Sequence, residues 1–89
     1  MHKGTSKADD GGSELAKVHI SALRVGLGTQ LEQRRNAVEL TQQQVADLAG
    51  VSRRSIIAVE GGDPTSLNTL LSVLDVLGLQ ITLQTGRSE

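Results

Sequence analysis

The stretch TQQQVADLAGVSRRSIIAVE, residues 41 to 60, decides the fold because it predicts two short helices joined by a tight turn. Thr41 can cap the first helix, and Gln44, three residues later, can reach back to it in a capping box. Gly50 ends this helix, since glycine alone adopts a positive φ without a steric penalty from Cβ. Ser52 then caps the second helix. Helix, short turn and helix together form a helix-turn-helix unit.

The second of these helices begins with two arginines. Arg53 and Arg54 lie where the helix dipole is already positive and where an acidic side chain would be favoured by about 0.3–1 kcal/mol. A residue choice that opposes local stability often marks a functional position, and arginine here can reach guanine edges or phosphates. The alternative is a pair of solvated surface residues, but in this turn we favour contact with DNA. Ile57 and Ala58 add an apolar outer face, which suits thymine methyl groups or a protein partner.

The composition excludes several function classes. The chain has no Phe, Trp or Tyr, so it lacks the aromatic platforms on which readers of RNA and single strands stack bases. Without cysteine there is no disulfide or thiolate site, and His2 and His19 have no partner at metal-ligand spacing, so we expect neither metal nor cofactor. We expect no catalytic residues and no enzyme, because the carboxylates are scattered. A net charge of −1 predicts modest, salt-sensitive DNA affinity per chain, raised by dimerisation.

The two ends of the chain are polar. Residues 1–13, MHKGTSKADDGGS, have almost nothing to bury and are expected to be disordered. They lack the apolar region of a signal peptide, and no run approaches the roughly 18–20 apolar residues of a membrane helix. We therefore expect a cytoplasmic, nucleoid-associated protein that does not bind a membrane. Residues 86–89 form a second polar tail.

Residues 14–85 form one domain, whose first part is ambiguous. The apolar positions of residues 14–25 fit both a helix and a strand. We expect a loose lead-in and then a helix from about Ala22 or Gly26 to about Val38. The residues expected to face the core, from this helix and from the two helices of the helix-turn-helix, are Leu27, Leu31, Val38, Val45, Ala46, Ala49, Ile56 and Val59.

The last third of the domain predicts a dimer. Residues 66–77 form a helix that is apolar on more than one face, and so small a chain cannot cover it without a second copy. Residues 79–84, LQITLQ, alternate as in a half-buried strand. Because a lone strand leaves its backbone unpaired, we expect antiparallel pairing with a twofold-related chain through Leu79, Ile81 and Leu83. The alternative is pairing with residues 18–23 of the same chain.

From about Leu27 to Leu83 the chain resembles the phage-repressor-like (Xre-type) helix-turn-helix family, and within it the HipB-like group of antitoxins and regulators. The resemblance is carried by RRNAVELTQQQVADLAGVSRRSIIAVEGG, by LNTLLSVLDVLG and by LQITLQ. It implies a mainly α fold of four to five helices, with a short C-terminal β-strand that pairs across a dimer.

The resemblance also assigns roles to individual residues. Gln42 matches a glutamine that binds a DNA phosphate and braces the recognition helix. Arg35 and Glu60 match a partly buried ion pair, with the arginine also near phosphate. The positions that face the major groove are Ser52, Arg53, Arg54 and Ala58, while Ser55 is placed near backbone or base. Polar side chains are common where this chain has Ile57 and Ala58, so its operator sequence stays open.

These features lead to a functional hypothesis. The chain is expected to be a sequence-specific repressor that binds double-stranded DNA as a homodimer, on a pseudopalindromic operator with half-sites about one helical turn apart. The resemblance further implies an antitoxin that binds a HipA-like toxin kinase and autoregulates its operon. Two alternatives are a stand-alone Xre-type repressor without a toxin and a protein-interaction module that does not bind DNA.

Overall fold

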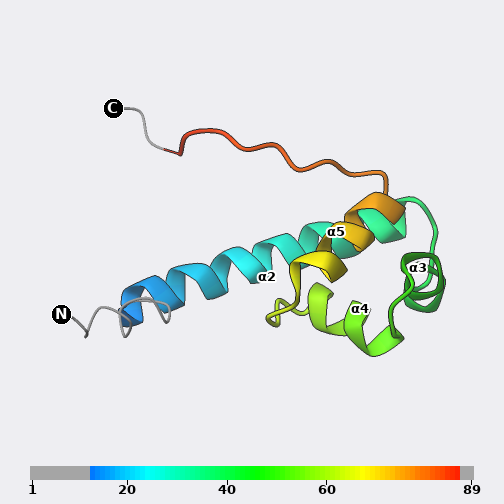
Figure 1. Cartoon of the computed structure of the whole chain (residues 1–89), viewed down its shortest axis with the longest axis horizontal. Helices are drawn as coiled ribbons and strands as arrows, with labels where there is room; N and C mark the ends of the chain where they lie inside the picture. Colours follow the sequence, from blue (N-terminus) through cyan, green and yellow to red (C-terminus); the bar gives the residue numbers. More distant parts are fainter. Residues whose placement is uncertain (1–12, 87–89) are drawn as a thin grey trace.

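The computed structural model describes residues 13–86, which contain four helices and no strand. They are α2 (Glu14–Ala37), α3 (Gln42–Ala49), α4 (Arg53–Glu60) and α5 (Leu67–Val76). The long α2 forms a spine, and the three short helices gather beside its carboxyl-terminal half (Figure 1). The mainly α class is therefore confirmed. Of the expected tails at residues 1–13 and 86–89, residues 1–12 and 87–89 lie outside the described residues. Within the described residues, no helix is long and apolar enough to cross a membrane.

The expected start of the first helix is wrong. Instead of a loose lead-in to about Ala22 or Gly26, α2 begins at Glu14, where the side chain of Ser13 accepts a hydrogen bond from the Ala16 amide at 3.2 Å. The alternative strand at residues 18–23 is wrong for the same reason, since these residues lie inside α2. Lengthening an existing helix needs no new nucleation and adds one backbone hydrogen bond per residue, so the helical reading of the ambiguous stretch prevails.

The local signals of the helix-turn-helix are confirmed. Thr41 Oγ1 accepts from the Gln44 amide at 3.0 Å, and Gln44 Oε1 accepts from the Thr41 amide at 2.8 Å, which is the predicted capping box. Gly50 has φ 74° and ends α3 in the left-handed conformation. The side chain of Ser52 then accepts from the Ser55 amide at 3.1 Å and starts α4.

All four helices contribute to one aliphatic core. α2 supplies Leu31, which is 1% exposed, and the core is completed by Val45, Ala46, Ile56, Val59, Val73, Leu74 and Leu77. Of the other expected core residues, Val38 and Ala49 are partly buried and Leu27 stays 38% exposed. The core is thus confined to the half of α2 that carries the other helices, and the amino-terminal part of α2 projects beyond it (Figure 1).

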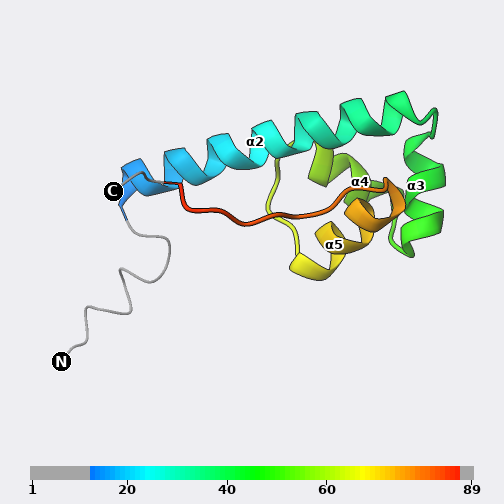
Figure 2. The ribbon, with the colours of Figure 1, turned by 90° about the horizontal axis from the view of Figure 1, so that it is seen from above.

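The C-terminal segment runs back along α2 towards the amino-terminal end of that helix (Figure 2). α5 ends at Val76, and Gly78 reverses the chain with φ 71°. Leu79 packs against the core, whereas Ile81 and Leu83 are 51% and 90% exposed. Residues 79–84 have no strand assignment in the described chain, so pairing across a dimer stays a prediction.

Candidate nucleic-acid interface

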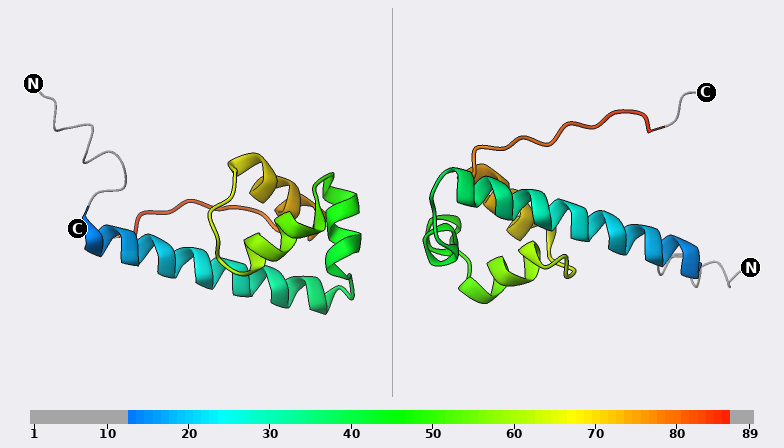
Figure 3. Two further views of the ribbon diagram at one scale, coloured as in Figure 1. Left: turned by 90° about the horizontal axis from the view of Figure 1, so that it is seen from below. Right: turned by 180° about the vertical axis from the view of Figure 1, so that it is seen from behind.

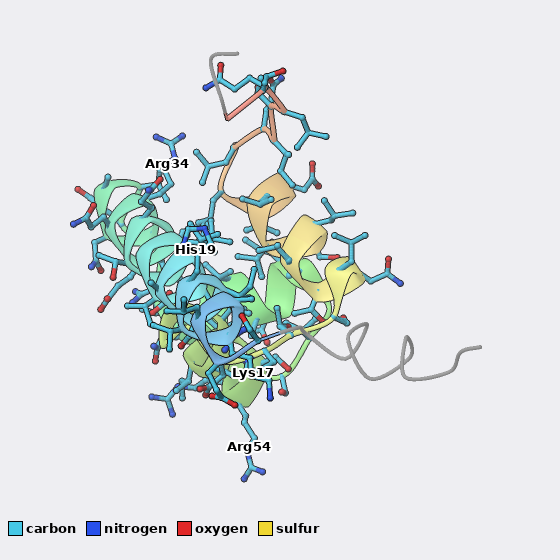
Figure 4. All side chains as sticks on the ribbon, turned by 90° about the vertical axis from the view of Figure 1, so that its left-hand side faces the viewer. Lys17, His19, Arg34 and Arg54 are labelled. Atoms are coloured by element: carbon cyan, nitrogen blue, oxygen red, sulfur yellow. The ribbon has the colours of Figure 1, made fainter. Side chains whose placement is uncertain are left out.

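The exposed face of α4 is defined by the two residues that anchor the helix. Ile56 and Val59, 1% and 4% exposed, turn one side of α4 into the core. With 3.6 residues per turn, Arg54 and Ile57 then lie on the opposite side, and Arg53 lies at its flank. The structure places all three in the exposed class, and Figure 4 shows Arg54 reaching away from the body of the molecule.

The other residues predicted for the groove lie at the edges of this face. Ser52 is exposed, while Ser55 and Ala58 are half-buried. The Ser52 oxygen caps α4, and its hydroxyl lies 3.0 Å from that of Ser55. Both hydroxyls therefore have a local role at the start of the helix. α4 thus presents two cations and one isoleucine outward, with small residues beside them.

A hydrogen-bonded network holds the far end of α4. Arg35 binds the carboxylate of Glu60 with two nitrogens, Nε to Oε2 at 2.6 Å and Nη2 to Oε1 at 3.1 Å. Arg35 Nη1 also donates to the Leu40 carbonyl at 2.9 Å and to Asn36 Oδ1 at 3.3 Å. Gln42 Nε2 donates to Glu60 Oε1 at 3.1 Å. The structure thus brings together three residues that the sequence singled out, from the end of α2 and the first turn of α3 to the last residue of α4.

The network is buried and electrostatically stable. The side chains of Arg35 and Glu60 are 11% and 8% exposed. The hydrogen bond to Glu60 raises the pKa of Arg35, burial opposes this, and the negative charges of Glu60 and Glu32 raise it further. Because these interactions hold the pKa of Arg35 above its ordinary value, the stabilisation is fully present at lower pH and is lost only as the pH rises through that raised pKa. The pair is therefore intact at neutral pH.

An open hollow of about 670 Å³ lies beside this network. It collects Arg35, Gln42 and Arg53 from three different helices, and its other lining residues are Asn36, Glu39, Leu40, Thr41 and Gln43. Arg35 makes four hydrogen bonds, and a guanidinium has five N–H donors, so one remains for an outside group. Arg53 is therefore the cation of this hollow that is most available to an anion such as a DNA phosphate.

The positive charge of α4 is not neutralised by the described part of the chain. Among residues 13–86 the ion pairs are Lys17–Glu14 and Arg35–Glu60, and neither includes Arg53 or Arg54. Of the acidic residues, Glu60 is held by Arg35, Asp47 Oδ1 accepts from Gln43 Nε2 at 2.9 Å, and Glu39 lines the same hollow as Arg53 without forming an ion pair with it. The face is therefore complementary to a polyanion.

These features define a DNA-binding regulator of the helix-turn-helix class. The chain belongs to the helix-turn-helix domain family, whose model matches residues 26–84, and it is of the phage-repressor-like (Xre) type. Among solved structures it is similar to the restriction-modification controller protein C.AhdI from Aeromonas hydrophila, with 32% sequence identity and a TM-score of 0.62 over 66% of this chain and 91% of that chain. The search of curated proteins finds no match.

Three contacts that support the interface were not predicted from the sequence. Arg24 Nε donates to the Gly62 carbonyl at 2.9 Å and ties α2 to the loop after α4. Arg34 Nε donates to the Leu77 carbonyl at 2.8 Å and satisfies the end of α5; this side chain projects from the side of the molecule opposite Arg54 (Figure 4). Gly28 packs against the backbone of α4. The favourable effect of a cation near a helix carboxyl end is the one signal that could have indicated a role for Arg34.

Proposed function

We propose that this chain is a sequence-specific repressor that binds double-stranded DNA as a homodimer, on a pseudopalindromic operator. The observation that carries the proposal is the outer face of α4, where Arg53 and Arg54 are exposed and without a carboxylate partner in residues 13–86. The Glu60 network and the core hold this helix in one orientation. A rigid, positively charged helix face is what direct readout in the major groove requires.

Each predicted site residue has a role in this proposal. Arg53 and Arg54 would read guanine edges, and a good bidentate contact discriminates by about 1–3 kcal/mol. Ser52, Ser55 and Ala58 would line the groove at the edges of the reading face. Arg35 and Gln42 have a mainly structural role through Glu60, and their second role would be a phosphate near the hollow.

The homodimer is supported by apolar surface that one chain leaves uncovered. Ile20, Leu23 and Leu27 recur along α2 at helical spacing and are 47%, 56% and 38% exposed. Leu27 also lines a hollow of about 390 Å³ between α2, α5 and the C-terminal segment, together with Leu70 and Ile81. Such continuous apolar surface is unusual on a monomer, and a second copy would cover it. The C-terminal segment lies on the opposite side of the molecule from α4 (Figure 3), so pairing there would leave both α4 helices free.

The experiment is a gel-shift titration of the full chain with duplexes selected from a random library, at one fixed salt concentration. Arg53→Ala combined with Arg54→Ala should abolish both affinity and sequence preference. Lys17→Ala is the control, because Lys17 is a cation in the first turn of α2, paired with Glu14 and far along the spine from α4. If the double variant binds as the wild type does, the assignment of α4 as the reading helix is wrong.

An antitoxin is the second candidate, favoured by exposed apolar residues on α5. Leu67 and Leu71 are 66% and 43% exposed, a surface that a HipA-like kinase could cover. The similarity to C.AhdI supports instead a regulator of a restriction-modification operon. The neighbouring gene distinguishes the antitoxin from the controller. Co-purification with the product of an adjacent kinase gene supports the antitoxin. An adjacent methyltransferase or nuclease gene supports the controller. Without either neighbour the stand-alone repressor is favoured. A chain without salt-dependent binding to any DNA would instead be a protein-interaction module.

A further inference from the structure

Ile57 is placed between the two arginines of the reading face. It follows Arg53 by four residues and Arg54 by three, and both spacings bring side chains together on a helix surface. All three residues are in the exposed class, and Ile57 keeps 47% of its surface exposed. The outermost part of α4 is therefore an aliphatic group with a guanidinium on each side.

Ile57 does not take part in the packing of the core. The core is anchored by Ile56 and Val59, and Ile57 is not among the residues that pack against it. Helix propensity does not explain the residue either, because a β-branched side chain is less favourable in an exposed helix than alanine, lysine or glutamate. Ile57 lies outside the core cluster and beside two unpaired arginines, so its exposed surface is free for a contact outside the chain.

The charges beside Ile57 decide what kind of partner fits. An apolar protein surface placed on Ile57 would bury two guanidinium groups that have no carboxylate partner in residues 13–86, and burying unpaired charges is costly. The major groove offers phosphates and guanine acceptors to the arginines, and its one apolar base-edge group is the C5 methyl of thymine. DNA therefore satisfies all three side chains together.

We propose that Ile57 is a specificity-determining residue that packs against the methyl group of a thymine in each half-site, beside the guanines read by Arg53 and Arg54. The inference rests on the proposed function, since it names the base chemistry that the reading helix selects. It predicts that every preferred half-site contains a thymine next to guanine contacts. Removing one contacted methyl should weaken binding about fourfold, and removing it from both half-sites about fifteenfold.

The experiment uses the full chain and changes the DNA first. A random duplex library is selected, and the preferred duplex is resynthesised with deoxyuridine in place of each thymine in turn. Deoxyuridine keeps the hydrogen-bonding edge of thymine and lacks only the methyl group, so a loss of affinity at one position locates the contact without any change to the protein.

The protein variant then assigns that contact to Ile57. Ile57→Ala should bind the thymine duplex about as weakly as the wild type binds the deoxyuridine duplex, and it should no longer distinguish the two. Leu48→Ala is the matched control, because Leu48 is also an exposed aliphatic residue, 66% exposed, but lies on α3. It should keep the full difference between thymine and deoxyuridine.

The possible failures are distinguishable. If wild type and Ile57→Ala discriminate thymine from deoxyuridine equally, or if the wild type does not discriminate at all, the inference is overturned while sequence-specific binding stands. If the wild type selects no sequence, both the proposed function and the inference are overturned. Loss of binding to a co-expressed protein in Ile57→Ala, with DNA discrimination unchanged, would assign Ile57 to a protein interface and also overturn the inference.

Discussion

Gly28 of α2 lies against the carbonyl oxygen of Glu60 so closely that a β-carbon at position 28 would be 2.5 Å from that oxygen. Two turns further along the same helix, Arg35 binds the Glu60 carboxylate. One residue at the end of α4 is therefore contacted by α2 through its backbone and through its side chain. These two contacts, about 10 Å apart along the helix axis at the usual rise per residue, determine the angle at which α4 presents Arg53 and Arg54.

Gly28→Ala should lower the free energy of unfolding by about 1–3 kcal/mol, because the new methyl group would meet the backbone oxygens of Glu60 and Val59, which cannot move separately from α4. Gly26→Ala is the control in the same helix. Nothing lies within 4 Å of its added β-carbon, so alanine should stabilise by up to about 1 kcal/mol through helix propensity. Urea denaturation followed by circular dichroism measures both. An equal gain in the two variants would show that α2 and α4 are not in close contact.

Arg35→Met and Glu60→Gln should each lower the free energy of unfolding by about 3–5 kcal/mol, because each leaves a buried group without its partner. The exposed pair of Lys17 and Glu14, 3.7 Å apart with side chains 54% and 89% exposed, serves as the control. Lys17→Met should cost at most about 1 kcal/mol. Thermal denaturation in matched buffers compares the variants, and similar losses from both pairs would contradict the assigned burial.

Glu39→Gly should raise the free energy of unfolding, whereas Gly50→Ala should lower it. Both have a positive φ, 61° and 74°, which costs a residue with a β-carbon about 1–2 kcal/mol. Gly50→Ala adds this strain but removes about 0.4–1 kcal/mol of unfolded-state entropy, so it should destabilise by a net amount of roughly 0.5–1 kcal/mol, although the space beside it is empty. Glu39→Gly removes the strain but adds about 0.4–1 kcal/mol of unfolded-state entropy, so a net gain of roughly 0.5–1 kcal/mol is expected. Urea titration at one temperature gives both values, and a loss for Glu39→Gly would argue against the turn geometry after α2.

Ile81→Asp or Leu83→Asp should shift the chain from dimer to monomer without unfolding it, because these side chains are 51% and 90% exposed in the single chain. Leu79 is unsuitable for this test, since it packs against the core. Gln84→Asp introduces the same charge at an alternate position and should leave the dimer intact. Sedimentation equilibrium measures the association. A dimer that survives both substitutions would place the interface elsewhere, with the exposed stripe of α2 as the next surface to test.

The helix-turn-helix was predictable because its signals are local. The capping box of Thr41 and Gln44, the glycine at position 50 and the cap at Ser52 each depend on residues within one turn, and neighbours in sequence are neighbours in space whatever the rest of the chain does. The amino-terminal half of α2 was not predictable in this way. Its apolar residues fit both the helical and the strand period. The helix forms because extending an existing helix needs no new nucleation.

In the candidate site, too, local features were predictable and long-range contacts were not. Position along α4 indicated that Ile57 and Ala58 face away from the core, because the helical period determines which residues lie together, and the structure leaves Ile57 exposed and Ala58 half-buried. In the sequence, Gly28 is only a residue of low helix propensity. Its place against Glu60 depends on α4, more than thirty residues later, crossing α2 at that point.

By itself, then, the sequence determined the three short helices, the caps of the helix-turn-helix and the face of α4 that carries charge, since capping and periodicity act over a few residues. Only the tertiary structure decided that Arg24 and Arg34 are used inside the chain, on the carbonyls of Gly62 and Leu77, while Arg53 and Arg54 form no ion pair within residues 13–86. The physical reason is that a buried acceptor must find a donor, and which arginine can supply it depends on where distant segments meet.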